Sequence, residues 1–132
     1  MKKLIIPVLL LLLVFSCKKK DKKLYPAYYG QWSLIHFTEN NHEETYNTGD
    51  IIWDFNEYDE LVISVNTDLS NSQLPITTSG IYDFVGASEI VSIQNTQYAA
   101  KVEQDTLTLS RNAAAGGPVI KFLKSTIEAN SL

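Results

Sequence analysis

QWSLIHFTE, residues 31–39, is the stretch that decides the fold class of this 132-residue chain. Its aromatic and β-branched residues favour extended backbone, and a pair of asparagines follows it as a turn signal. Seven similar runs come after it: IIWDF (51–55), ELVISVN (60–66), SGIYDFV (79–85), EIVSIQN (89–95), QYAAKVE (97–103), TLTLSRN (106–112) and PVIKFLK (118–124). HEETYNT (42–48) is a weaker ninth candidate. Since no segment keeps a helical period long enough to cross a sheet, the sequence predicts an all-β fold.

The alternation of side chains along each run assigns its two faces. Trp32, Leu34 and His36 share one face of the first run, and Ile35 and Phe37 share the other. The same rule aligns further apolar sets: Ile51, Trp53 and Phe55; Leu61, Ile63 and Val65; Leu107 and Leu109; Ile120 and Phe122. One buried face and one solvated face are typical of antiparallel sheet.

Short turns connect these strands, at 56–60, 87–89 and 116–118, and they predict hairpins between sequential neighbours. A meander of this kind gains from closing on itself, because closure removes the exposed edges that an open sheet must protect. The sequence therefore predicts an antiparallel up-and-down barrel of about eight strands.

Charge divides the chain into two unequal parts. Residues 18–23 hold five lysines and one aspartate, a net charge of +4, and this polar run is expected to be a solvated tether. From residue 24 onward fourteen acidic residues outnumber four basic ones, for a net charge of −10. No lysine or arginine occurs between 24 and 100, which argues against nucleic acid as a partner, because binding it needs a basic footprint.

The first residues have the pattern of a secretory signal. Lys2 and Lys3 precede an uninterrupted apolar run, residues 4–15. As a helix this run rises about 18 Å, well short of the roughly 30 Å hydrocarbon core of a bilayer. Val14-Phe15-Ser16-Cys17 resembles the lipobox of bacterial lipoprotein signals. The resemblance implies cleavage before Cys17 and acyl chains on its sulfur and amino group; the alternative is an uncleaved signal anchor with a chance cysteine.

Cys17 is the only cysteine, so the chain after it forms no internal disulfide. The expected organisation is a signal peptide (1–16), an acylated cysteine with a Lys-rich tether (17–23) and a barrel domain (24–132). Lys18 directly follows Cys17, and in related lipoproteins a non-acidic residue there permits transfer to the outer membrane. The expected location is the bacterial cell envelope, on either face of that membrane.

Gly30-Gln31-Trp32 resembles the G-x-W opening of lipocalins. Trp53-Asp54-Phe55, Gly80-Ile81-Tyr82 and the late LTLSR run (107–111) add to the likeness, so that residues 30–124 look like the small lipocalin-like domains of bacterial lipoproteins. The resemblance implies that Trp32 plugs one end of the barrel. It also implies that Arg111 packs across the indole of Trp32 in a cation–π contact.

Eight strands enclose enough room either to be filled by side chains or to hold one small ligand. The candidates for facing a small apolar ligand are the large inward residues and the one ionisable residue predicted beside them: Trp32, Leu34, His36, Trp53, Phe55 and Phe122. The same residues would serve equally as a packed core. The long polar stretch 66–79, NTDLSNSQLPITTS, is expected to be a lid, a partner surface or a disordered connector.

Signals for catalysis or metal binding are poor. The sequence has no G-x-S-x-G, no phosphate-binding glycine loop and no paired histidine or cysteine at ligand spacing. We therefore expect no enzyme, no cofactor and no metal. Two functions remain: a membrane-anchored barrel that binds a small apolar ligand, and a filled barrel that serves as a structural or protein-interaction module for another envelope protein.

Overall fold

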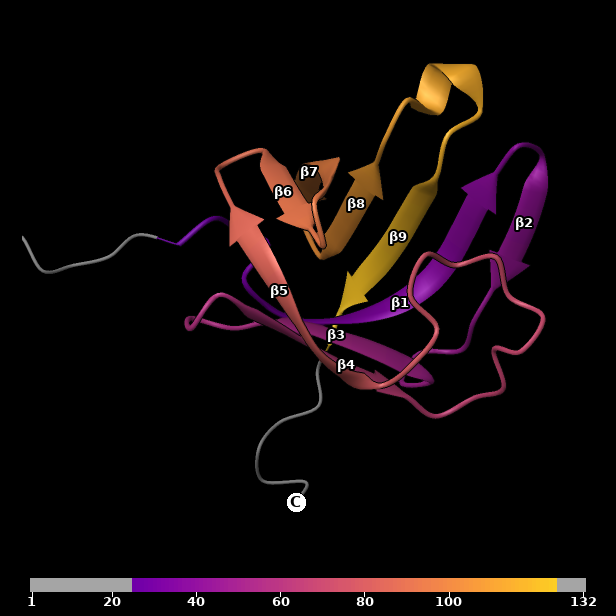
Figure 1. Cartoon of the computed structure of the whole chain (residues 1–132), viewed down its shortest axis with the longest axis horizontal. Helices are drawn as coiled ribbons and strands as arrows, with labels where there is room; N and C mark the ends of the chain where they lie inside the picture. Colours follow the sequence, from indigo (N-terminus) through magenta and orange to yellow (C-terminus); the bar gives the residue numbers. More distant parts are fainter. Residues whose placement is uncertain (1–24, 126–132) are drawn as a thin grey trace, which may run out of the picture.

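The structure, a computed structural model, describes residues 25–125 and is built almost entirely of β-strands (Figure 1). The strands are β1 (Gly30–Glu39), β2 (His42–Thr45), β3 (Ile51–Phe55), β4 (Glu60–Val65), β5 (Gly80–Gly86), β6 (Ile90–Ile93), β7 (Thr96–Glu103), β8 (Thr106–Ser110) and β9 (Val119–Lys124). One short 3-10 helix, η3 (Ala113–Ala115), interrupts the β8–β9 connection. The signal peptide, Cys17 and the Lys-rich tether lie outside the described residues.

The strands form one antiparallel sheet that closes into a barrel. From β3 to β8 each strand pairs with the one that follows it in the chain. The circle closes because β1 pairs with β3 on one edge and with β9 on the other. These eight strands close the barrel, so the prediction of an all-β, antiparallel barrel is confirmed. The weaker ninth candidate is β2, which lies beyond β3 along the same edge of β1. Between β2 and β3 the Ser33 hydroxyl accepts the N–H of Gly49 at 2.8 Å.

The alternation predicted for β1 is broken by a β-bulge. The register of β1 against β9 shifts between Leu34 and His36. Trp32 and Leu34 point into the barrel as predicted, but beyond the bulge Phe37 takes the inward position and is fully buried. His36 lies outside, with its Nε2 3.4 Å from Glu43 Oε1. The prediction that His36 shares the face of Trp32 is therefore wrong, because one extra residue in a strand reverses which face the following side chains occupy.

The barrel has two different ends, named here by what they carry. The terminal end is where β1 begins and β9 finishes, and Ser125 there donates its N–H to Gln31 O at 3.0 Å. The opposite end, the loop end, carries the connections 40–41, 46–50, 66–79, 94–95 and 111–118. Residues 25 and 125 therefore both lie at the terminal end, and the longest connection lies at the other (Figure 1).

Tyr28 plugs the terminal end. Its ring is buried and meets Phe55 edge-on, with 5.6 Å between the ring centroids. Its hydroxyl donates to Ala87 O at 2.8 Å, and its own carbonyl accepts the Nε1–H of Trp32 at 2.7 Å. A Cβ on Gly86 would come within 2.5 Å of the Tyr28 hydroxyl, so only glycine fits beside this plug.

Arg111 does not pack on Trp32. Trp32 pairs with Lys124 at the terminal end, whereas Arg111 follows Ser110, which pairs with Val119 at the loop end. The Arg111 side chain is exposed there. The role that the lipocalin resemblance implied for Arg111 is therefore wrong, because β8 runs away from the indole it was expected to cover.

Side chains fill the interior of the barrel. The rings of Trp53 and Phe122 lie 5.1 Å apart, and those of Trp53 and Phe55 lie 6.3 Å apart. The inward residues with no exposed surface are Leu34, Phe37, Ile51, Leu61, Val91, Leu107, Leu109, Ile120 and Phe122. A side chain with no accessible surface touches neither bulk water nor an internal void large enough for water. The middle of the barrel is therefore a packed core.

Candidate functional site

The structure separates the six residues predicted to face a ligand into two groups. Five of them lie together in the core with at most 2% of their surface exposed: Trp32, Leu34, Trp53, Phe55 and Phe122. The sixth, His36, is outside the barrel. The five hold no open space between them, so their arrangement is that of a core.

One polar group in this core has no partner. Among the buried side-chain polar atoms of residues 25–125, the Nε1 of Trp53 is the one without a hydrogen bond. Leaving a buried donor unpaired costs about 1–3 kcal/mol. The position of Trp53 is thus set by packing against Phe55 and Phe122 and not by its N–H.

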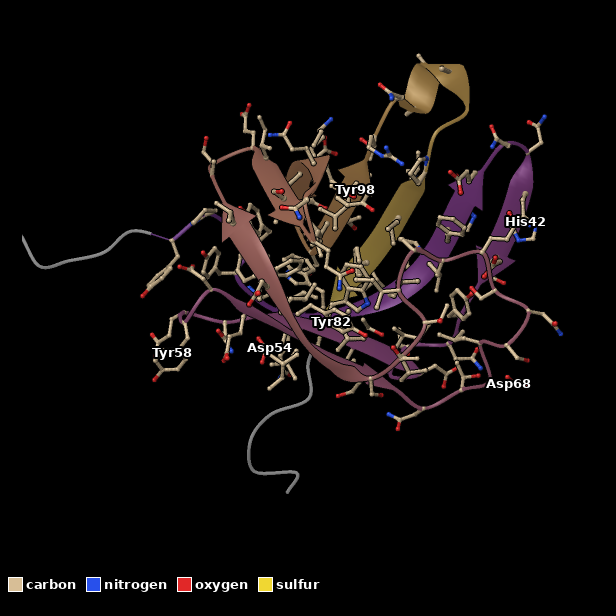
Figure 2. The ribbon with its side chains drawn as sticks, in the orientation of Figure 1. His42, Asp54, Tyr58, Asp68, Tyr82 and Tyr98 are labelled. Carbon is tan, nitrogen blue, oxygen red and sulfur yellow. The ribbon has the colours of Figure 1, made fainter. Side chains whose placement is uncertain are left out.

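The 66–79 connection covers the loop end. It contains no helix or strand, yet Leu69, Leu74 and Ile76 are buried and belong to the same apolar core as the barrel interior. Figure 2 shows the connection beside β2, with Asp68 directed outward from it. The connection is therefore an ordered lid, and of the three alternatives drawn from the sequence the disordered connector is wrong.

The Glu44 carboxylate holds this lid against β2. Ser72 Oγ donates to Glu44 Oε1 at 2.6 Å, and the Gln73 N–H donates to Oε2 at 2.9 Å. From β2, His42 Nε2 lies 2.6 Å from Oε2, and the hydroxyl of Tyr46, the residue after β2, also donates to Oε1. Two contacts from the lid and two from β2 and the residue after it thus converge on one carboxylate, and we name these five residues the Glu44 latch.

The latch is charged under all physiological conditions. Burial alone would raise the pKa of Glu44, but the hydrogen bonds from Ser72, Tyr46, Gln73 and His42 together outweigh it and lower the pKa from 4.5 to about 2. Burial and the adjacent Glu44 carboxylate raise the pKa of Tyr46 from 10.0 to about 12. Glu44 therefore stays ionised and Tyr46 stays protonated near neutral pH, which favours the hydrogen bonds of the latch.

The latch does not form a nucleophile. The hydroxyl of Ser72 donates to the carboxylate and not to His42, and a carboxylate with a pKa of about 2 is too weak a base to activate it. Nor do residues 25–125 bring together three or more metal-ligating side chains at a point that would hold an ion. The chemistry available here is hydrogen bonding, and its effect is to fix the shape of the lid.

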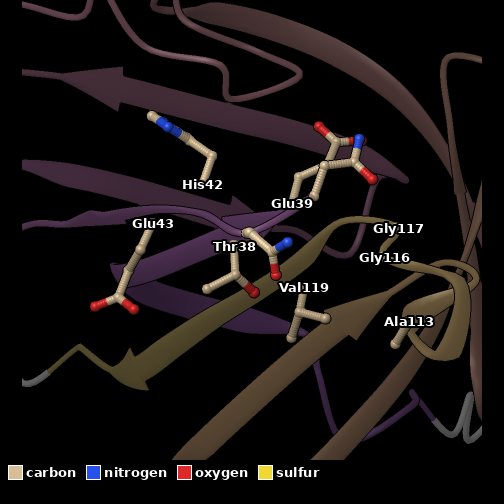
Figure 3. Close-up of a pocket in the computed structure, with 10 residues that line it drawn as sticks. Thr38, Glu39, His42, Glu43, Ala113, Gly116, Gly117 and Val119 are labelled. Atoms are coloured by element: carbon tan, nitrogen blue, oxygen red, sulfur yellow. The ribbon is translucent and has the colours of Figure 1, made fainter.

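A polar hollow lies beside the lid at the loop end (Figure 3). It has a volume of about 390 Å³ and lies between the β1–β2 turn and the β8–β9 connection; its lining is Thr38, Glu39, Asn40, Asn41, His42, Glu43, Ala113, Gly116, Gly117 and Val119. Asn40 joins its two walls by donating its N–H to Gly116 O at 2.8 Å. Gly116 has a φ of 86°, which a side chain would strain. His42 and Glu43 point away from each other, so their side chains do not converge on a common ligand (Figure 3).

Sequence reasoning did not find the latch. His42, Glu44 and Tyr46 alternate along HEETY, which placed them on one strand face. Their partner Ser72, however, is 28 residues away in a stretch without periodicity. On the β2 side, the pattern shows a carboxylate flanked by two polar aromatic residues at alternate positions, which does not identify the partner.

Comparisons with protein-family models, with curated proteins and with solved structures give no match for this chain. Within residues 25–125, no helix is long and apolar enough to cross a bilayer.

Proposed function

We propose that this chain is a lipid-anchored lipoprotein of the bacterial cell envelope whose filled barrel acts as a protein-interaction module. The observation that carries the proposal is that the two ends of the barrel carry different features. The chain enters at the terminal end, and the latched lid with the adjacent hollow occupies the loop end. A rigid, polar surface held away from the attachment point suits recognition of another protein.

The anchor in this proposal is Cys17, on the strength of the lipobox resemblance. Seven residues, 18–24, lie between Cys17 and Tyr25, and the eight steps from Cys17 to Tyr25 span at most about 29 Å when fully extended. Acyl chains bind at about 0.8 kcal/mol per buried methylene, so two or more chains hold a small domain firmly. Attached in this way, the barrel has its terminal end next to the tether and its loop end on the opposite side.

The filled interior is the reason for choosing a partner protein over a small ligand. An apolar carrier needs an enclosed space of roughly 300 Å³ or more. Here Leu34, Phe37 and Phe122 have no exposed surface in the middle of the barrel. The kinship with lipocalins, proposed from the G-x-W opening and the closed barrel, would then be one of architecture without the carrier function.

Two measurements test the proposal. Cells that express the chain are labelled with an alkyne fatty acid; we expect labelling of the wild-type chain, and an equally labelled Cys17→Ser variant would refute the anchor. For the partner surface, a photo-reactive amino acid replaces Asn71 in the lid or, as a control, Glu57 at the terminal end, both exposed. We expect a discrete cross-linked protein from position 71 alone; the same product from position 57, or none from 71, would refute the loop end as the contact surface.

A further inference from the structure

Strand β5 changes partners half-way along its length. Residues 80–83 pair with β4, and residues 84–86 pair with β6. Because β6 ends at Ile93, the edge of residues 80–82 that faces away from β4 has no neighbouring strand. The nearest hydrogen bond to it is a long one, from the Gln94 N–H to Asp83 O at 3.4 Å. The wall of the barrel thus contains a short free strand edge.

A hollow of about 450 Å³ runs along this free edge. Its lining comes from β5 on one side and from the β6–β7 region on the other: Ile81, Tyr82, Asp83, Phe84, Val85, Ser92, Gln94 and Asn95. Natural sheets usually guard a free edge with lysine, proline or a covering element. Here residues 79–83, SGIYD, contain neither lysine nor proline.

The outer face of β5 is apolar and exposed. Ile81 and Val85 point outward, with 65% and 74% of their surface accessible. Ile90 on β6 and Tyr58 in the β3–β4 turn are also exposed (Figure 2). This turn is close to β5, because the carbonyl of Asp59, the residue after Tyr58, accepts the N–H of Phe84. Most of the large exposed apolar residues in the described chain therefore gather around β5, and such a patch marks an interaction surface.

The charged side chains that β3, β4 and β5 carry on this wall are all acidic. On the outer wall Glu60 stands directly opposite Asp83 across the β4–β5 ladder, an arrangement of like charges that destabilises a sheet. Asp54 lies on the same wall one strand further, and residues 25–100 include no lysine or arginine. A basic partner would relieve this repulsion, whereas a second copy of this chain would bring the same acidic wall and increase it.

We propose that the free edge of β5 binds an extended segment of another protein that carries apolar and basic side chains in turn on one of its two faces. Its backbone would pair with residues 79–83 as an added strand. On the outward face, to which every second residue points, an apolar side chain would cover Ile81, and the basic side chain two residues away would meet Asp83 and Glu60. This surface lies on the barrel wall, apart from the Glu44 latch, and it does not depend on the lipid anchor.

The test uses the full chain, isotopically labelled and held in mild detergent, and a synthetic probe peptide, acetyl-VTKTVTK-amide, whose valines and lysines all lie on one face of an extended strand. We expect the probe to shift the amide resonances of residues 79–83 and to slow hydrogen exchange at Ile81 by about tenfold, as two or three added hydrogen bonds would do. Two control peptides separate the contributions: one is N-methylated along one edge and cannot pair as a strand, and the other carries glutamate in place of lysine. Both should bind at least about tenfold more weakly.

A matched pair of variants places the contact. Ile81→Lys puts a positive charge on the free edge and should weaken probe binding about tenfold, whereas Ser64→Lys adds the same charge at an exposed position of β4 and should change it by less than about twofold. Equal loss in both variants, unchanged resonances at 79–83, or equal binding of the N-methylated peptide would overturn the proposal. Concentration-dependent self-association through β5 without peptide would also overturn it, in favour of a second copy. If Ile81→Lys fails to fold, the control peptides decide on the wild-type chain.

Discussion

Replacing Glu44 by glutamine should loosen the lid and destabilise the whole domain. At about 1.4 kcal/mol per pKa unit, the lowering of the Glu44 pKa from 4.5 to about 2 corresponds to roughly 3 kcal/mol of folding free energy. The glutamine retains one carbonyl acceptor, and the site keeps some contact with water, since 13% of the Glu44 side chain is exposed. We therefore expect Glu44→Gln to lower the free energy of unfolding by about 2 kcal/mol at pH 7.

The pH dependence gives this prediction its sign. Because the pKa of Glu44 is lower in the folded chain than in the unfolded chain, the ionised carboxylate contributes its full stabilisation above a pH of about 4.5. This contribution to the free energy of unfolding is lost as the pH falls toward 2. Urea titrations followed by tryptophan fluorescence should show the difference between wild type and Glu44→Gln shrinking between pH 5 and about 2.

Glu43→Gln is the matched control. Glu43 precedes Glu44 on β2, its side chain is 65% exposed, and its contact with His36 lies at the surface, so the substitution should cost less than about 0.5 kcal/mol. Protease cleavage within 66–79 should increase for Glu44→Gln alone. Equal stability of the two variants at pH 7, or a difference that does not change with pH, would refute the latch.

Three further predictions concern the packing of the barrel. Gly86→Ala should destabilise the domain by about 1–3 kcal/mol in thermal unfolding, because the added Cβ would overlap the Tyr28 hydroxyl. Gly80→Ala is the control and should be tolerated better, since a Cβ there would lie 3.6 Å from the nearest atom, on the Tyr82 ring. Arg111→Ala should change the free energy of unfolding by less than about 0.5 kcal/mol in urea, and a loss above 2 kcal/mol would restore a packing role for this exposed side chain. Trp53→Phe should lower the free energy of unfolding by less than about 1.5 kcal/mol in the same assay, because the loss of ring volume is offset by the removal of a buried N–H without a partner. A loss near 4 kcal/mol would show that this N–H is in fact bonded.

The sequence was sufficient for the barrel because its strands obey a local rule. Alternation placed Trp32, Trp53 and Phe122 inside, since each lies where the register against a neighbouring strand is regular; Trp32 precedes the bulge in β1. The rule failed at His36 because the bulge in β1 depends on the registers of two neighbouring strands, which a single strand does not encode.

The candidate site was harder to predict because its contacts are distant in the chain. Arg111 was placed by resemblance, which fixes a position in sequence but not the end of the barrel at which that position lies. The Glu44 latch joins residues 42–46 to residues 72–73, and the pattern of neither segment indicates contact with the other. The apolar residues of 66–79 gave the one usable sign, because Leu69, Leu74 and Ile76 are more apolar than a solvated connector requires.

The position of residue 25 at the opposite end of the barrel from the lid has a mechanical consequence. When a partner holds the loop end, a pull on residue 25 first reaches the Tyr28 plug and then runs along the axis of β1, whose hydrogen bonds to β3 and β9 stand across that direction. These bonds then carry the load together, in shear. A pull between residues 25 and 125, which lie at the same end, would instead open the bonds between β1 and β9 one after another.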